Sequence, residues 1–401
     1  MPSPHLRGDG ALRLSDPAPG PRPTGDDTAR LQHDVSRHGG SPVRPLDPRL
    51  ERLLRSDGER DGAAGPVGRG GRGPSGAGDS DGGALGPAGG TGGPAGPDLM
   101  RSVKPGGYLW WYVDALSDDG RSGLTLIAFI GSVFSPYYAW AGRKDPHDHV
   151  AINVALYGAP QGWTMTERGR RALARDTTRL TIGPSALSWT EDGLSVTLDE
   201  RMAPVPKPLR GRLTVRPVLQ NNRTFFLDAE GRHRWRPVWP RARIEVDLDA
   251  PAARWSGSAY FDTNDGDEPM QDAFQRWDWS RGDLADGGCA LLYDLTPRPH
   301  RGPARLLSLR LTPEGQWEEV APPPPAALPA GPSWGVARGI RSTGPARVVE
   351  TLEDTPFYTR SLVESVFHGE TVRSVHESLD LDRLTSRWVP WLLPFRMPRR
   401  P

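Results

Sequence analysis

The sequence predicts a mainly β protein, in which antiparallel strands form two similar barrel or sandwich units after a disordered N-terminal tail. Three observations lead to this prediction. Residues 1–100 are rich in glycine and proline and hold almost no large apolar side chains, so they bury too little surface to offset chain entropy. From Gly106 onward, aromatic and β-branched runs alternate with turn signals. Few segments longer than ten residues show a helical period.

The predicted strands follow one another from residue 106. Residues 106–134, GGYLWWYVDALSDDGRSGLTLIAFIGSVF, are expected to form two strands around an Asp-Asp-Gly turn. Further strand segments are predicted at residues 149–158, 162–169, 177–200 and 209–218. In the last two of these segments, apolar and polar residues alternate. Residues 168–180 are the best candidate for a helix, and residues 268–277 for one or two helical turns.

A weak internal sequence repeat predicts the domain organisation. Residues 110–131 and residues 276–298 share one order of features, namely aromatic residues, an acidic turn and an apolar strand. This order favours a duplicated β unit, although any two hairpins can share it. We therefore predict a first β domain at residues 101–250 and a second at residues 251–401, after the tail of residues 1–100.

Composition limits the function classes. The net charge of +1 argues against a large electrostatic footprint for nucleic acid. Nearly all basic residues are arginine, which is not by itself evidence of nucleic-acid binding. Cys289 is the only cysteine, which excludes an intramolecular disulfide and a cysteine-based zinc site. The N-terminus has no apolar signal-peptide core, and the longest apolar run, residues 123–134, is shorter than the roughly 20 residues of a membrane-spanning helix. We expect a soluble or peripheral protein.

The C-terminal residues have an unusual composition. In SRWVPWLLPFRMPRRP, the large apolar side chains Trp388, Trp391 and Phe395 lie among prolines and arginines. Tryptophan and arginine around apolar residues suit a membrane interface. A tail packed on the barrel explains the composition equally well. The first interpretation predicts a cytoplasmic protein in peripheral contact with the inner membrane.

Two motifs were considered as metal sites. The stretch SAYFDTNDGDEPM gathers carboxylates, but an EF-hand loop starting at Asp262 would need an oxygen ligand where Gly266 stands and a glutamate where Ala273 stands. The EF-hand is therefore excluded, while a looser cation site stays open. His147 and His149 would share a strand face, which suits a metal. No third ligand is obvious nearby, so core histidines are the favoured interpretation.

Two short motifs place candidate catalytic side chains in pairs. His233 and Trp235 share a face if GRHRWRPVWP is a strand, and Tyr260 and Asp262 share a face by the same rule. Asp262 ends an apolar and aromatic run. Partial desolvation and neighbouring acids are therefore expected to raise its pKa and keep it protonated at neutral pH. An ordinary strand end is the alternative.

These motifs resemble the carotenoid 1,2-hydratase family, also called hydroxyneurosporene synthases. The resemblance rests on residues 106–138, on DHVAINVALYG and on HRWRPVWPRARIEVDLDAPAARWSGSAYFDTNDGDEPM, and it covers roughly residues 105–395. It implies two lipocalin-like antiparallel β-barrel domains. It also implies a cofactor-independent hydro-lyase that adds water across the terminal C1=C2 bond of acyclic carotenes such as neurosporene or lycopene. In that family, the matching catalytic residues would be His233, Trp235, Tyr260 and Asp262.

The implied reaction explains the residue types. Protonation of C2 gives a tertiary cation at C1, which water then captures. A neutral Asp262 would be the general acid, and Trp235 and Tyr260 would present π faces to the cation. His233 would either deprotonate the water or hold Asp262 in place. The expected partners are an acyclic carotenoid, water and a membrane surface, with no cofactor, metal or nucleic acid. A non-catalytic lipocalin-like carotenoid or lipid carrier and a hydratase of another isoprenoid stay open as alternatives.

Overall fold

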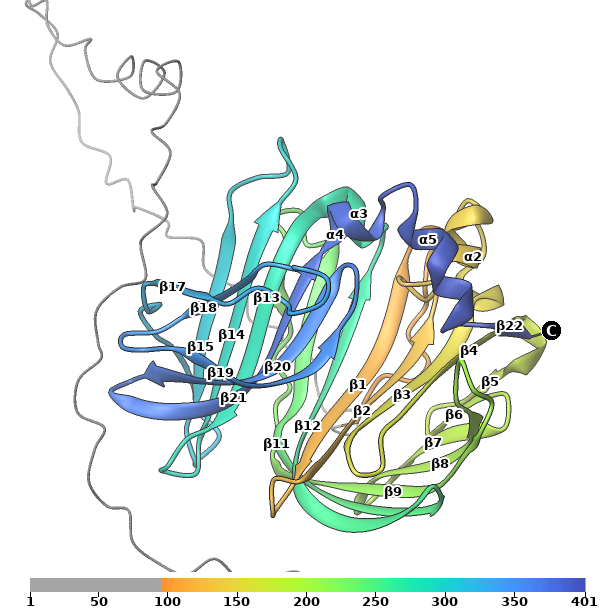
Figure 1. The fold of residues 1–401 in the computed structure, drawn as a ribbon, viewed down its shortest axis with the longest axis horizontal. Helices are drawn as coiled ribbons and strands as arrows, with labels where there is room; N and C mark the ends of the chain where they lie inside the picture. Colours follow the sequence, from red (N-terminus) through yellow and green to blue (C-terminus); the bar gives the residue numbers. More distant parts are fainter. Residues whose placement is uncertain (1–95, 401) are drawn as a thin grey trace, which may run out of the picture. The chain divides into compact units, whose positions relative to one another are not determined.

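The structure is a computed structural model that describes residues 96–400 (Figure 1). The predicted disordered tail, residues 1–100, lies outside the described residues except for its last five. The described part is mainly β, as predicted, with only short helices between and after the strands. Most connections are antiparallel hairpins, which agrees with the frequent turn signals in the sequence.

The first sheet has 13 strands, with β10 pairing beside β11. Its order is β22-β4-β3-β2-β1-β12-β11-β9-β8-β7-β6-β5. The bounds are β1 Tyr108–Ser117, β2 Ser122–Ile130, β3 Val150–Gly158, β4 Gly162–Arg168, β5 Leu173–Arg175, β6 Arg179–Ile182, β7 Ser185–Thr190, β8 Gly193–Arg201, β9 Pro208–Leu219, β10 Phe225–Phe226, β11 His233–Ala250, β12 Ala252–Gly266 and β22 Arg399–Arg400.

The second sheet has seven strands in the order β16-β15-β14-β13-β21-β20-β19. Its bounds are β13 Phe274–Asp283, β14 Cys289–Pro297, β15 Arg305–Leu311, β16 Trp317–Glu319, β19 Arg347–Asp354, β20 Tyr358–Phe367 and β21 Glu370–Asp380. A separate two-stranded ribbon consists of β17 Pro325–Leu328 and β18 Arg338–Arg341.

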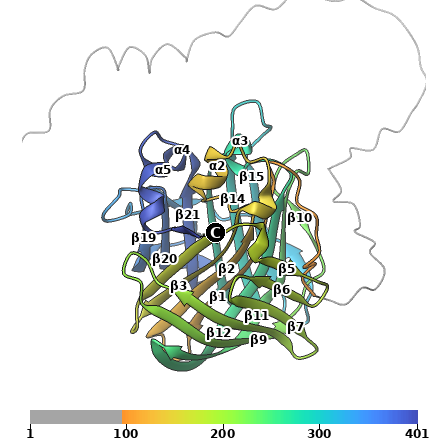
Figure 2. The same cartoon turned by 90° about the vertical axis from the view of Figure 1, so that its right-hand side faces the viewer.

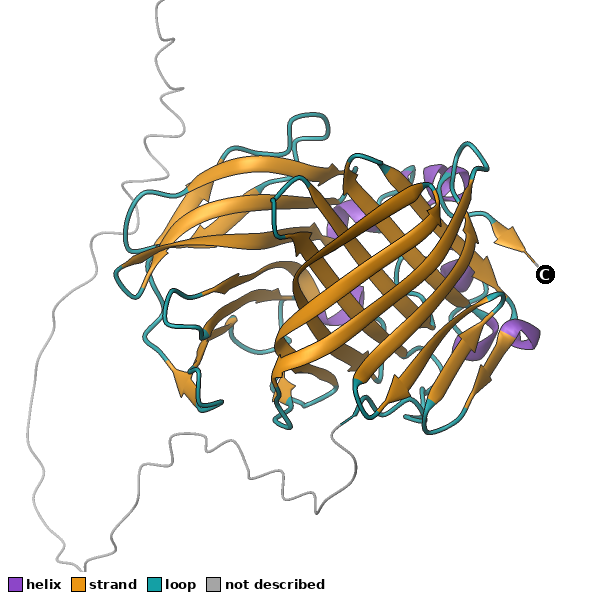
Figure 3. Ribbon diagram, turned by 90° about the horizontal axis from the view of Figure 1, so that it is seen from below, coloured by secondary structure: helices purple, strands orange, loops and turns teal. Residues whose placement is uncertain are grey.

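The first sheet curls around its own core without closing into a barrel, as Figure 3 shows from below. Among the described residues its hydrogen-bonded order ends at β22 on one side and at β5 on the other, so the two edges do not pair. The prediction of two β-barrels is therefore not confirmed. The predicted boundary at residues 250/251 falls in the turn between β11 and β12, and both strands belong to this first sheet.

Strand β1 is buried on both faces, and its period of two sorts its side chains between two cores. Trp111 and Val113 point into the core enclosed by the curl. Trp110 and Tyr112 belong to a second core, which the first sheet shares with the second sheet. A buried ion pair also joins the sheets, because Arg281 on β13 donates through Nε to Asp114 on β1 at 2.8 Å.

The helices gather at one end of the two sheets, as Figures 1 and 2 show. They are α2 Pro136–Trp140, α3 Met270–Ala273, α4 Leu381–Leu384 and α5 Val389–Leu392, with 3₁₀ turns η1 Pro146–Asp148, η2 Arg170–Ala172 and η3 Leu393–Phe395. The single turn of α3 agrees with the prediction for residues 268–277. The helix expected at residues 168–180 is wrong, because the segment forms only the 3₁₀ turn η2 before β5 pairs with β6 at the edge of the sheet.

Among residues 96–400, no helix combines the length and the apolar character that crossing a bilayer requires.

Candidate active site

An apolar cavity lies between the two sheets. Its volume is about 1360 Å³, counting the part that is open to solvent. Strands β1, β2, β3, β4 and β12 supply one wall, and β13, β14, β19, β20 and β21 supply the other. The segment 389–397 lines it as well. Most of the lining is aromatic or aliphatic, so the few polar side chains within it stand out as candidates for chemistry.

Asp262 is one of these polar side chains, and three neighbours fix its carboxyl group. Its Oδ2 accepts hydrogen bonds from Trp235 Nε1 at 2.9 Å and from the Tyr260 hydroxyl at 2.8 Å. Its Oδ1 lies 3.3 Å from Asn264 Nδ2. Trp235 stands opposite Asn264 in the pairing of β11 with β12, so strand register brings all four side chains together. Neither Trp235 nor Tyr260 lines the cavity, and both are completely buried behind Asp262.

This geometry assigns the proton of a neutral Asp262 to Oδ1. The Oδ2 atom already accepts two hydrogen bonds and has no free direction for a proton. The Asn264 Oδ1 atom is buried and has no partner among the described residues. Because the two ends of an amide are assigned rather than observed, a rotated Asn264 would accept from protonated Oδ1 of Asp262. The acidic proton therefore sits on the carboxyl oxygen that the two donors leave free.

Burial raises the pKa of Asp262 from its ordinary value of 3.8 to about 8. The donors Trp235 and Tyr260 lower this pKa, because they favour the anion, while the negative charges of Glu377 and Asp114 raise it. The predicted rise in pKa is thus present, but with a different electrostatic cause. The responsible charges come from β21 and β1, and the acidic loop after β12 is not among them.

His233 lies apart from the carboxyl group that it was expected to assist. Its Nδ1 lies 2.9 Å from the Tyr108 hydroxyl, and its Nε2 lies 3.5 Å from Glu268. It does not line the cavity, and no hydrogen bond joins it to Asp262 in the described structure. Burial, together with the positive charges of nearby Arg232 and Arg234, lowers its pKa to about 3. The ring is therefore neutral and a weak base.

The acids that follow Asp262 form ion pairs. Asp265 contacts Arg234 at 2.6 Å, and Asp267 contacts Arg234 at 2.6 Å and Lys104 at 2.9 Å. Arginines also surround Glu268, with Arg232 at 3.1 Å. The charges of these acids are matched by basic side chains, so they fasten the end of the β11–β12 hairpin.

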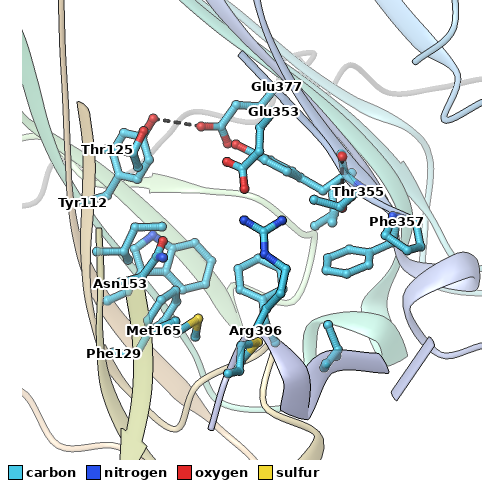
Figure 4. Close-up of a pocket in the computed structure, with 18 of the residues that line it drawn as sticks. Tyr112, Thr125, Phe129, Asn153, Met165, Glu353, Thr355, Phe357, Glu377 and Arg396 are labelled. Carbon is cyan, nitrogen blue, oxygen red and sulfur yellow. Dashed lines mark hydrogen bonds between the residues drawn. The ribbon is translucent and has the colours of Figure 1, made fainter. Parts of the chain in front are cut away.

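A second polar group lies on the opposite wall of the cavity, and the sequence did not reveal it. Glu377 on β21 accepts a hydrogen bond from the Tyr112 hydroxyl at 2.8 Å and pairs with the buried guanidinium of Arg360. Glu353 lies beside it, and Arg396 points toward both carboxylates in Figure 4. Tyr112 was visible within the WWYVD motif. Nothing in the sequence indicated that a strand 265 residues later would meet it.

Within residues 96–400, no group of three or more His, Cys, Asp or Glu side chains is placed to hold a metal ion. His147 and His149 lie in different environments. His149 is buried and contacts Glu167 at 2.8 Å, while His147 lies in η1. The spacing of two therefore does not produce a shared strand face.

Large exposed aromatic side chains surround the mouth of the cavity. Trp391 is 68% exposed and Phe395 is 72% exposed, although their neighbours Leu392 and Leu393 line the cavity. The Trp391 ring lies 5.2 Å from the ring of Trp140 on α2. An exposed apolar patch of this kind is typical of an interaction surface.

Comparisons with known proteins point to one family. A family model described as carotenoid hydratase CrtC matches residues 126–401. The acyclic carotenoid 1,2-hydratase of Thiocapsa roseopersicina is 50% identical over 392 residues, which cover 95% of this chain and 96% of the relative. That of Rubrivivax gelatinosus is 50% identical over 390 residues, which cover 95% of each chain. These matches extend into residues 1–100, beyond the range of the resemblance given above.

A shorter relative carries the same description. The acyclic carotenoid 1,2-hydratase of Cereibacter sphaeroides is 41% identical over 280 residues, which cover 69% of this chain and 98% of the relative. Among solved structures, an AttH protein from Nitrosomonas europaea aligns at 13% identity with a TM-score of 0.49, covering 68% of this chain and 91% of its own. This likeness is too weak to support an argument about the fold.

Proposed function

Because the chain belongs to the carotenoid hydratase CrtC family, we propose that Asp262 protonates the terminal double bond of an acyclic carotenoid bound between the two sheets. The overall activity is the addition of water across the C1=C2 bond, which makes the protein a hydro-lyase. The observation that carries the mechanism is a buried carboxyl group with a raised pKa in an apolar cavity. An isolated alkene has no polar handle, so the enzyme must supply a strong local proton donor.

The proposed steps follow from the geometry. The proton on Asp262 Oδ1 is transferred to C2 of the alkene, and the π electrons form the new C–H bond. The Asp262 anion that remains keeps its two donors, Trp235 and Tyr260, which stabilise the new negative charge. The tertiary cation at C1 is then captured by water. The proton that water loses returns to Asp262, so no reagent besides water is consumed.

Aromatic faces in the cavity support the cation. Trp235 and Tyr260 were expected in this role, but they are engaged behind the carboxyl group. Tyr112, Trp110 and Trp279 line the cavity instead. A cation over such a ring gains about 0.5–2 kcal/mol, and more where water is excluded. This stabilisation offsets part of the cost that the raised pKa of the acid imposes on proton transfer.

We assign His233 a positioning role. Its contact with the Tyr108 hydroxyl links the start of β11 to β1, and the Tyr108 ring stacks on Trp110 at 4.9 Å between centroids. Trp110 in turn lines the cavity. His233 therefore acts on the reaction through the wall of the cavity. Its Nδ1 is already in contact with a hydroxyl, which leaves this atom no direction toward the incoming water.

We also propose that the cavity mouth rests on the surface of a membrane, with the protein on its cytoplasmic side. Trp391 and Phe395 would enter the interfacial layer, where exposed aromatic side chains are favoured. Residues 383–400 contain five arginines and no acidic residue, which complements anionic headgroups. A carotenoid dissolved in the bilayer could then enter the cavity without crossing water.

The direct test uses the purified protein with lycopene or neurosporene in anionic vesicles, followed by product analysis for the 1-hydroxy compound. We expect hydration by the natural protein and none by Asp262→Asn. A protein that binds the polyene and returns it unchanged would be a carrier, and the proposed mechanism would be rejected. Product from another isoprenoid but from no carotenoid would instead reassign the substrate.

A further inference from the structure

Glu377 lies in the cavity, where it could act on the attacking water, a step that Asp262 does not assist as the acid. One of its carboxylate oxygens accepts from the Tyr112 hydroxyl at 2.8 Å and pairs with Arg360. Its other oxygen, Oε2, has no hydrogen-bond partner among the described residues, and the side chain lines the cavity. The carboxylate is thus fixed through one oxygen and available through the other.

The two carboxyl groups face the same space. Tyr112 stands directly opposite Asp262 in the pairing of β1 with β12, and side chains of opposite residues lie on one face of a sheet. The Tyr112 hydroxyl reaches across to Glu377 on the second sheet. The two sheets therefore hold the carboxyl groups of Asp262 and Glu377 around the region where the terminal double bond would lie.

Other acids near the cavity are less suitable. Asp114 does not line the cavity, and its Oδ1 accepts from Arg281. Glu353 accepts from Tyr157 at 3.2 Å, and its burial raises its pKa, which favours its neutral form. Of Asp114, Glu353 and Glu377, only Glu377 combines a free oxygen in the cavity with an ion pair to a buried arginine.

We propose that Glu377 is the catalytic base that holds and deprotonates the attacking water. Its free oxygen accepts a hydrogen bond from the water, which aims the water oxygen at C1. As the C1–O bond forms, one O–H bond of the water breaks and the proton passes to Glu377. Transfer of this proton from Glu377 to the Asp262 anion restores both groups. Arg360 is a positioning residue, since it acts only through Glu377.

This inference rests on the proposed hydration, and isotope exchange separates the two. In D₂O, Asp262 carries deuterium and delivers it to C2. A cation that is not captured by water loses a proton and reverts, which leaves deuterium at C2 of the recovered carotenoid. Exchange therefore reports protonation alone, whereas the 1-hydroxy product reports protonation followed by water capture.

We expect Glu377→Gln to lower hydration by about 100-fold or more, the range typical of a lost general base, while exchange at C2 continues. Glu364→Gln, on the neighbouring strand β20 and outside the cavity lining, is the matched control and should hydrate normally. If Glu377→Gln leaves Arg360 unpaired and does not fold, the double variant Glu377→Gln/Arg360→Met removes both charges together.

The outcomes are distinct. Unchanged hydration by the folded Glu377 variant would overturn the inference. Loss of both hydration and exchange by that variant would also overturn it, because Glu377 would then act before the cation forms. Failure of the natural protein to hydrate or exchange any acyclic carotenoid would reject the proposed function itself. Two results together support the assignment. The Glu377→Gln protein exchanges deuterium at C2 but does not hydrate, and the Asp262→Asn protein does neither.

Discussion

Replacement of Asp262 by asparagine tests whether the acid works because it is neutral. Asparagine has nearly the same shape, and its side-chain oxygen can still accept from Trp235 and Tyr260. The change replaces the titrating O–H group with an amide NH₂ group that does not titrate. The pKa of Asp262 is about 8, so the natural side chain is about 90% protonated at pH 7 and about 10% at pH 9. We therefore expect hydration by the natural protein to fall about tenfold between these pH values, on one titration step.

The same shift predicts how stability depends on pH. Asp262 holds its proton more tightly in the folded protein than in the unfolded chain, where its pKa is close to 3.8. Its contribution to stability is complete below pH 3.8, declines as the pH rises toward 8, and is lost above that value. The shift of about four pKa units corresponds to a loss on the order of 5 kcal/mol.

Asparagine does not ionise, so the Asp262→Asn protein does not lose this folding stability as the pH rises. Asp262→Asn should therefore be inactive at every pH and, above pH 8, more stable than the natural protein.

Two measurements on the same preparations check this reasoning. Initial rates of 1-hydroxy product formation from pH 6 to pH 10 give the titration, and urea unfolding at pH 6 and pH 9 gives the difference in stability. A rate that stays level to pH 10 would show that the working acid is not Asp262 with a raised pKa. A fully active Asp262→Asn protein would remove the residue from the mechanism. Equal stability changes in both proteins would contradict the assigned pKa.

Further predictions concern the surroundings of this group. Tyr260→Phe removes a donor that favours the anion, so the alkaline limb of the pH–rate profile should move to higher pH. Trp391→Ser should weaken co-sedimentation with anionic vesicles and leave hydration of detergent-dispersed substrate unchanged. Arg281→Met should lower the free energy of unfolding by about 3–5 kcal/mol, because it leaves Asp114 buried without its ion-pair partner. Removal of residues 1–95 should preserve specific activity, and a large loss would show that this region contributes.

The local part of the site could be read from the sequence because it depends on strand period. Alternation placed His233 with Trp235 and Tyr260 with Asp262, and the end of an aromatic run indicated a desolvated carboxyl group. The sequence also indicated the mainly β class and most strand positions. These features depend on residues that are neighbours along one strand, whose side chains the period of two sorts reliably.

What the sequence could not indicate depends on pairing between distant strands. Tyr112 and Asp262 are opposite each other only because β1 pairs with β12, and Glu377 faces them only because a second sheet packs against the first. The curl of the first sheet is likewise a property of many strands together. The pKa of Asp262 was expected from its sequence neighbours, but its electrostatic part comes from such long-range contacts.

The two faces of β1 and β12 separate the requirements of folding from those of chemistry. Odd-numbered residues such as Trp111 and Phe261 fill the core inside the curl, and even-numbered residues such as Tyr112 and Asp262 face the cavity. Substitutions at even positions can therefore reshape substrate preference while the packing of the curl is retained. A single-residue insertion in either strand would exchange the two faces downstream of it and damage both.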